Sequence, residues 1–204
     1  MKFGIVTMAA LALAVASTAA HAADPRYPDW PCAQAKVPDI SLAAVWAGPP
    51  LDDVQNKWKD DAKVSALVSK LAARKTPLDE AEKSVKEFLA ASASDKTANA
   101  KLLFAGLFDT LNAQRSSVMS GLERVSRKQR DAADKIRDET LRLQALQGAT
   151  PRDETKVEEL SNQLIWETRI FEDRRKVVRF VCEVPTTIDQ RLFALGRVIQ
   201  QEME

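Results

Sequence analysis

The amino-acid sequence predicts an all-α protein in which a long antiparallel coiled-coil hairpin projects from a small helical bundle. Three observations predict this fold. Beyond residue 50, apolar residues recur at helical spacing and strand patterns are almost missing. The segment from about 96 to 147 lacks proline, and Gly148 to Pro151 directly after it is typical of a tight turn. A proline- and tryptophan-rich segment precedes the helices and is expected to be extended.

The first 22 residues have the features of a secretory signal peptide. Lys2 is basic, residues 4–15 are apolar, and Ala20-His21-Ala22 matches the small-x-small pattern that signal peptidase cleaves. The apolar run of about 12 residues is shorter than the roughly 20 that a membrane-spanning helix needs. We therefore predict cleavage after Ala22, a periplasmic location and no membrane-spanning segment in the remaining chain.

Residues 23–50 are predicted to form an extended arm packed on the folded body. They contain six of the nine prolines, which fix φ and remove backbone donors. Tyr27, Trp30 and Trp46 lie in this arm, and large aromatic side chains of this kind usually fill grooves on their own protein. An aromatic site that stacks on a ligand is the alternative interpretation.

Cys32 and Cys182 are the only two cysteines, and in an oxidising compartment they are expected to pair. The bond would connect the arm to the helical body. A structural disulfide is favoured over a redox pair, because redox cysteines usually lie close together in sequence, as in Cys-x-x-Cys.

Residues 51–204 are predicted to form one helical domain. Thr76-Pro77 indicates a helix start, and so does Thr150-Pro151, because a threonine cap followed by proline is common there. Pro185 is expected to stop one helix, with Thr186 or Thr187 capping the next. The expected helices cover about 51–74, 77–92, 96–147, 151–183 and 187–203.

The short turn near residue 149 requires the helices on either side to run antiparallel. Pairing outward from this turn is expected to bring together Ile136 with Leu164, Leu122 with Val178, and Val118 with Val181. No other predicted helix covers the hairpin beyond about residue 116, so residues 116–182 should project as a stalk. The seam is interrupted by the polar residues Arg115, Gln129, Glu139, Glu167 and Arg174. One interpretation is that they fix the register of the two helices, and the other is that they mark a flexible point in the hairpin.

The charges along this stalk are uneven. Ten basic residues near its base face only Glu123, Glu172 and Asp173, whereas the tip is acidic. One interpretation is an ordinary solvated helix surface with local ion pairs, and the other is a collar that binds an anionic partner. Besides Arg115, the basic residues are Arg124, Arg127, Lys128, Arg130, Arg169, Arg174, Arg175, Lys176 and Arg179.

The composition also restricts the chemistry that this chain can perform. Its single histidine, His21, lies in the predicted signal peptide, and its six glycines form no phosphate-binding loop. We therefore expect no catalytic residues, no cofactor and no metal. The leading hypothesis is a periplasmic adaptor, accessory subunit or assembly factor that binds a protein or an acidic envelope component, not nucleic acid, and that could self-associate. A holdase-type chaperone is the alternative, and a ligand- or metal-binding protein is the third class.

Overall fold

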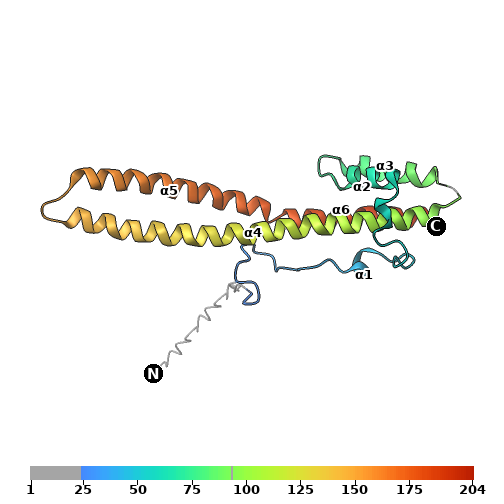
Figure 1. The fold of residues 1–204 in the computed structure, drawn as a ribbon, viewed down its shortest axis with the longest axis horizontal. Coiled ribbons are helices and arrows are strands. Elements are labelled where there is room, and N and C mark those ends of the chain that lie inside the picture. The colour runs from blue at the N-terminus through green and yellow to red at the C-terminus, as the bar shows by residue number, and fades with distance from the viewer. Residues whose placement is uncertain (1–23, 93) are drawn as a thin grey trace, which may run out of the picture.

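A computed structural model describes residues 24–92 and 94–204, and the predicted signal peptide lies outside these residues. The described part is helical, with loops and turns between the helices and no strand (Figure 1). None of its helices combines the length and the apolar character needed to cross a membrane. The elements are α1 (Leu42–Val45), the short 3-10 helix η1 (Lys57–Lys59), α2 (Ala62–Ala72), α3 (Leu78–Ala90), α4 (Lys96–Gly148), α5 (Glu154–Val181) and α6 (Val184–Met203).

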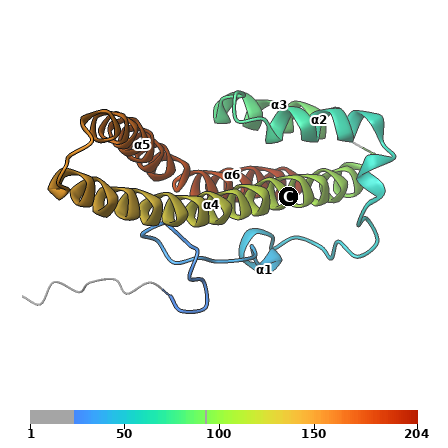
Figure 2. The same ribbon diagram turned by 60° about the vertical axis from the view of Figure 1, so that its left-hand side comes forward.

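Helix α4 is the axis of the molecule. It has 53 residues and so extends about 80 Å at 1.5 Å per residue. α5 returns along its distal half and α6 along its proximal half, while α2 and α3 cover only the proximal end (Figures 1 and 2). This arrangement confirms the predicted all-α fold, with a coiled-coil hairpin projecting from a helical base.

The apolar core lies in the base. Phe104 and Leu107 of α4 are fully buried, together with Leu71 of α2, Leu89 of α3 and Leu195 of α6. Gly106 allows this close packing, because a Cβ at that position would lie 2.7 Å from Val68 and 2.9 Å from Trp58. The base therefore holds the densely packed part of the protein.

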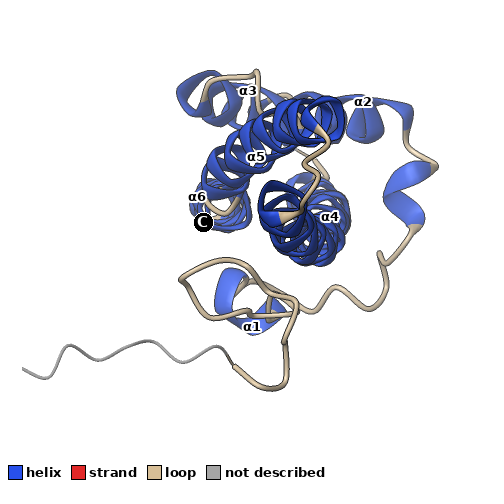
Figure 3. Ribbon diagram, turned by 90° about the vertical axis from the view of Figure 1, so that its left-hand side faces the viewer, coloured by secondary structure: helices blue, strands red, loops and turns tan. Residues whose placement is uncertain are grey.

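The arm and α1 run alongside α4, on the side opposite α2 and α3 (Figures 1 and 3). Trp46 is buried and stacks on Phe104, with ring centroids 4.2 Å apart. Its indole Nε1 donates to the carbonyl of Pro49 at 2.8 Å. Gly196 leaves room for this approach, since a Cβ there would come within 2.9 Å of the Val45 carbonyl oxygen. The arm is thus packed into the base core at one end.

The helix expected over 51–74 is broken into two parts, and that prediction was wrong in its first half. Residues 52–56 form turns, and Asn56 has a left-handed φ of 65°. α2 begins only at Ala62, because the Asp61 side chain accepts hydrogen bonds from the Lys63 and Val64 backbone N–H groups. Leu51, Val54 and Trp58 are buried in the core although no continuous helix connects them. Their spacing in the sequence therefore resembled that of a helix.

Three other helix ends differ from the predicted bounds. α5 begins at Glu154, because Asp153 caps it by accepting from the Lys156 N–H at 3.1 Å. α6 begins at Val184, with Pro185 in its first turn, where the missing N–H costs no hydrogen bond. Thr76 does not cap α3, because its hydroxyl donates instead to the Lys70 carbonyl near the end of α2.

Polar contacts between α4 and α5 define the register of the hairpin. Gln129 Nε2 donates to the Phe171 carbonyl at 3.1 Å, and Lys135 pairs with Glu167 at 2.6 Å. Gln163 donates to Glu139 at 3.0 Å. The partners lie at nearly equal distances from the turn, in agreement with the predicted register. The polar positions in the distal seam therefore bind across it.

Candidate functional site

Two hollows flank the hairpin where the stalk (residues 116–182) meets the base. The larger, of about 820 Å³, is the α4–α5 groove. The smaller, of about 490 Å³, is the arm-side hollow. Val178 and Gln129 line both of them, so the seam between α4 and α5 separates the two. The junction of stalk and base thus presents two different surfaces.

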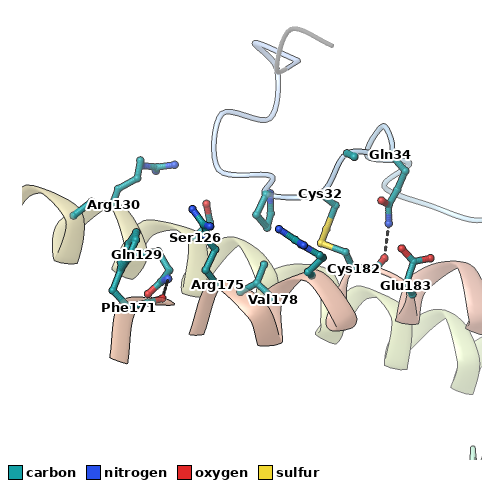
Figure 4. A pocket seen from close by; sticks show the side chains of 14 residues that line it. Cys32, Gln34, Ser126, Gln129, Arg130, Phe171, Arg175, Val178, Cys182 and Glu183 are labelled. Atoms are coloured by element: carbon teal, nitrogen blue, oxygen red, sulfur yellow. Dashed lines mark hydrogen bonds between the residues drawn. A yellow bond between two sulfur atoms is a disulfide. The ribbon is translucent and has the colours of Figure 1, made fainter. Parts of the chain in front are cut away.

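The arm-side hollow is closed along one edge by the arm itself (Figure 4). Cys32 and Cys182 lie at disulfide distance, with their Sγ atoms 2.03 Å apart and their Cα atoms 5.5 Å apart. Gln34 donates from its side-chain amide to the Cys182 carbonyl, and Trp30 Nε1 donates to the Gln34 carbonyl at 2.7 Å. The arm is therefore attached to the point where α5 ends.

Asp29 of the arm forms ion pairs with two of the predicted collar residues. Its carboxylate accepts from Arg127 at 2.5 Å and from Arg130, and Arg130 also donates to the Pro28 carbonyl at 3.2 Å. The hydrogen bonds from Arg130 and Arg127 lower the pKa of Asp29 below its usual value. Arg127 and Arg130 therefore bind the arm in this structure.

Further along the arm, two more contacts fix it to α4. Lys36 pairs with Glu123 at 2.5 Å and lies 4.6 Å from the ring centre of Tyr27. Arg115 is 3 % exposed and donates to the Pro38 carbonyl at 3.1 Å. Its Nε lies 2.8 Å from Asp189 of α6, although the N–H is not aligned for a hydrogen bond. Burial raises the pKa of Asp189 more than Arg115 lowers it. Arg115 therefore connects the arm to α6 and is not available on the surface.

The α4–α5 groove lies across the seam from the arm-side hollow and has an apolar floor with a basic rim. The floor includes the residues of the predicted pairs Leu122 with Val178 and Val118 with Val181, and a Cβ at Gly121 would meet only the Arg124 guanidinium, at 3.8 Å. Arg124 and Lys128 of α4 and Arg174 of α5 line the rim and are exposed. Across residues 24–92 and 94–204, no acidic side chain forms an ion pair with any of these three.

The remaining predicted collar residues lie elsewhere on α5. Arg175 and Arg179 line the arm-side hollow, and Arg175 pairs with Glu172 at 3.4 Å. Lys176 pairs with Asp173 at 3.1 Å, and Arg169 lies 5.9 Å from the ring centre of Trp166. Of the nine cationic residues, only three border the groove, three line the arm-side hollow, Arg127 pairs with Asp29 of the arm, and the other two lie elsewhere on α5.

An apolar row runs along the outer edge of α5 next to this groove. Trp166 is 63 % exposed, Ile170 44 %, Val177 59 % and Phe180 76 %. Ile170 and Val177 also line the groove, so the row and the groove form one surface. Val177 and Phe180 were not identified as exposed from the sequence, because periodicity alone does not show which apolar positions of α5 face away from α4.

Asp29 was also missed as a residue of this region. Its neighbours Pro28 and Trp30 indicate an extended arm, but no local pattern indicates which cation it meets 98 and 101 residues away.

Within the part of the chain that the structure describes, no three His, Cys, Asp or Glu side chains gather closely enough to hold a metal ion. The surface instead combines exposed aliphatic and aromatic groups with cations. No protein-family model, curated protein or solved structure matches this chain.

Proposed function

We propose that this chain is a periplasmic, non-enzymatic adaptor, accessory subunit or assembly factor that binds a protein partner through the α4–α5 groove. The observation that carries the proposal is the combination of an apolar floor with three cations, Arg124, Lys128 and Arg174, that pair with no acidic group in the described residues. Apolar area supplies most of the free energy of protein association, and the cations select an acidic partner.

The periplasmic part of the proposal is supported by the signal-peptide pattern of residues 1–22. The cysteine pair supports it as well, because disulfides persist mainly in oxidising compartments. The non-enzymatic part is supported by the groove lining, in which Asp173 is the single acidic residue and is paired with Lys176. An open groove of this kind suits contact with a protein better than chemistry on a small molecule.

Site-specific photocrosslinking tests this function. A photoreactive amino acid is placed at Val177 in the groove, and a matched one at Leu141 near the tip, because both side chains are 59 % exposed. In the envelope fraction of the source cells we expect one discrete adduct from position 177 and none from position 141. Reversing Arg124 and Arg174 to glutamate should abolish that adduct.

Equal adducts from both positions, or an adduct that survives both charge reversals, would contradict the proposed use of the groove. Isolation of the adduct by mass spectrometry then identifies which protein lies against position 177.

A holdase-type chaperone is the second candidate, and the exposed row of Trp166, Ile170, Val177 and Phe180 favours it. A holdase would give many adducts of different mass from position 177 and would suppress aggregation of unrelated unfolded proteins. Failure to protect several such clients excludes this candidate.

A further inference from the structure

The apolar row on α5 has the spacing of a second coiled-coil seam. Residues 166, 170, 173, 177 and 180 follow one another at intervals of four and three, which keeps them on one edge of the helix. The first seam of α5, which contains Leu164, Phe171 and Val178, packs on α4. α5 therefore presents one seam to α4 and a second one to the outside.

The groove continues a surface that is already filled in the base. A hollow at the end of α2 is lined by Ala72 and Ala73 together with Val184 and Ile188 of α6, and it shares Val118 with the α4–α5 groove. In the base, α2 packs along α4 and α3 along α6. Beyond Ala73, no helix of the described residues continues the layer of α2 and α3 over the stalk, although the α4–α5 groove extends along it. One more helix would extend the layer of α2 and α3 along the stalk.

The charges beside the row identify what kind of helix fits. Arg124 and Lys128 lie across the groove from the row, with Arg174 on the near wall. Arg169 and Lys176 lie on the other flank of the row, one position before the positions of Ile170 and Val177. Both flanks are therefore cationic, and residues at flanking positions of a coiled coil determine the choice of partner.

A second copy of this chain fits this seam poorly. An antiparallel pair that sets Trp166 against Phe180 would bring Arg174 near its own copy and Arg169 near Lys176. It would also place Asp173 against itself at the centre of the seam. Like charges opposed in this way are destabilising, so the charges favour a different, acidic chain.

From this geometry we infer that the α4–α5 groove receives one amphipathic α-helix of the partner, with acidic residues on both sides of its apolar face. This inference rests on the proposed function and specifies the partner's chemistry. The row from 166 to 180 covers 14 residue steps, or about 21 Å, so the bound helix has about two heptads in contact. Asp173 pairs with Lys176 but stays exposed, so it can also accept from a lysine or arginine at the centre of the apolar face of the bound helix.

Synthetic peptides test this inference on the full, disulfide-bonded chain. A panel of fluorescein-labelled 18-residue helices carries leucine or alanine on one face, glutamate on both flanks and a central lysine. Each has a matched peptide with lysine in place of every flanking glutamate, and a second match with a central proline. By fluorescence anisotropy we expect saturable binding of the glutamate peptides, and at least tenfold weaker binding of both matches at low salt.

Variants of the protein locate the binding surface. Val177→Asp and Arg174→Glu should each weaken binding of the glutamate peptides at least fivefold. The matched controls are Ile165→Asp, an exposed apolar position outside the second seam, and Arg142→Glu, an exposed cation near the tip. These two should leave the affinity unchanged, and circular dichroism checks that each variant keeps its helix content.

Three results would overturn the inference: no binding by any glutamate peptide, equal binding by the lysine peptides, or equal loss in the control variants. A dimer in analytical ultracentrifugation that Val177→Asp dissociates would show that a second copy occupies the seam. The crosslinking experiment keeps the two proposals separate. An adduct at position 177 without peptide binding contradicts the acidic helix alone, whereas the absence of any adduct from position 177 when Arg124 and Arg174 are unchanged contradicts the proposed function.

Discussion

The base and the stalk share one helix, α4, but they bury their apolar residues to very different degrees. In the base, Phe104, Leu107 and Leu111 of α4 are inaccessible to solvent. In the stalk, burial on α4 stops at Leu122, and on α5 only Val157 and Leu164 are buried. Two helices cannot enclose a core, whereas the base has four helices and the arm. From this difference we infer that the base provides most of the protein's stability, whereas the stalk provides exposed surface.

The largest expected effect tests this division directly. Phe104→Ala removes a fully buried ring that packs on Trp46, and we expect it to lower the free energy of unfolding by about 3 to 5 kcal/mol. Leu143→Ala, in the half-exposed stalk seam, should cost under about 1.5 kcal/mol. Urea unfolding followed by circular dichroism measures both. Similar losses in the two variants would contradict the comparison.

The disulfide between the arm and the end of α5 should give the next largest effect. It joins residues 150 positions apart, and replacing both cysteines by serine should cost about 2 to 5 kcal/mol. The same variant should release the arm near Asp29, which limited proteolysis detects as new cleavage in residues 24–38. Stability unchanged from the parent would show that noncovalent contacts alone hold the arm.

Arg115 lies at the boundary between base and stalk, and its loss should have an intermediate effect. Arg115→Ala leaves the Pro38 carbonyl and the half-buried Asp189 without their partner, which should cost about 2 to 3 kcal/mol. Arg137→Ala, which removes an exposed i,i+3 pair with Asp134, is the control and should cost under about 0.5 kcal/mol. Thermal and urea unfolding of the two variants should separate them clearly.

The smallest expected effect concerns the arm and its dependence on pH. Arg130 and Arg127 lower the pKa of Asp29 in the folded protein, so their contribution is present above the usual carboxyl pKa. It is lost as the pH falls through the lowered pKa. In the cysteine-free variant, protease cleavage of the arm should therefore increase in acid, as followed with pepsin. Asp29→Asn, which lacks the titrating carboxylate, should show this higher cleavage at every pH. If cleavage of that variant depended on pH in the same way as cleavage of its parent, the role of Asp29 would be contradicted.

The hairpin could be predicted from sequence because its signals are local or periodic. Gly148 and Pro151 indicate the turn, and the seven-residue repeat fixes which faces of the helices meet, including Leu122 with Val178. The break before α2 was missed because the apolar spacing runs through it, whereas the Asp61 carboxylate caps the helix that begins at Ala62. Periodicity alone does not distinguish a capping aspartate from a surface one.

The candidate site was predictable only in part, because it depends on where the arm lies. The basic collar could be recognised in the sequence. In the structure, however, Arg127 and Arg130 pair with Asp29, which lies about 100 residues earlier in the chain. The arm also occupies one side of the hairpin and leaves the side of Val125 and Val177 open. Charge counting along a helix gives no information on such coverage by a distant segment.

The unbroken course of α4 also has a mechanical consequence. α4 runs from the base core to the tip, whereas the returning chain is interrupted at Cys182 and Glu183 between α5 and α6. A force applied at the tip thus reaches the base through one continuous helix, α4, and through two helices, α5 and α6, that are joined by a short junction. The covalent bond from Cys32 joins the arm to that junction, and the arm in turn contacts α4 at Glu123 and Arg115, so the junction is connected to the continuous helix through the arm.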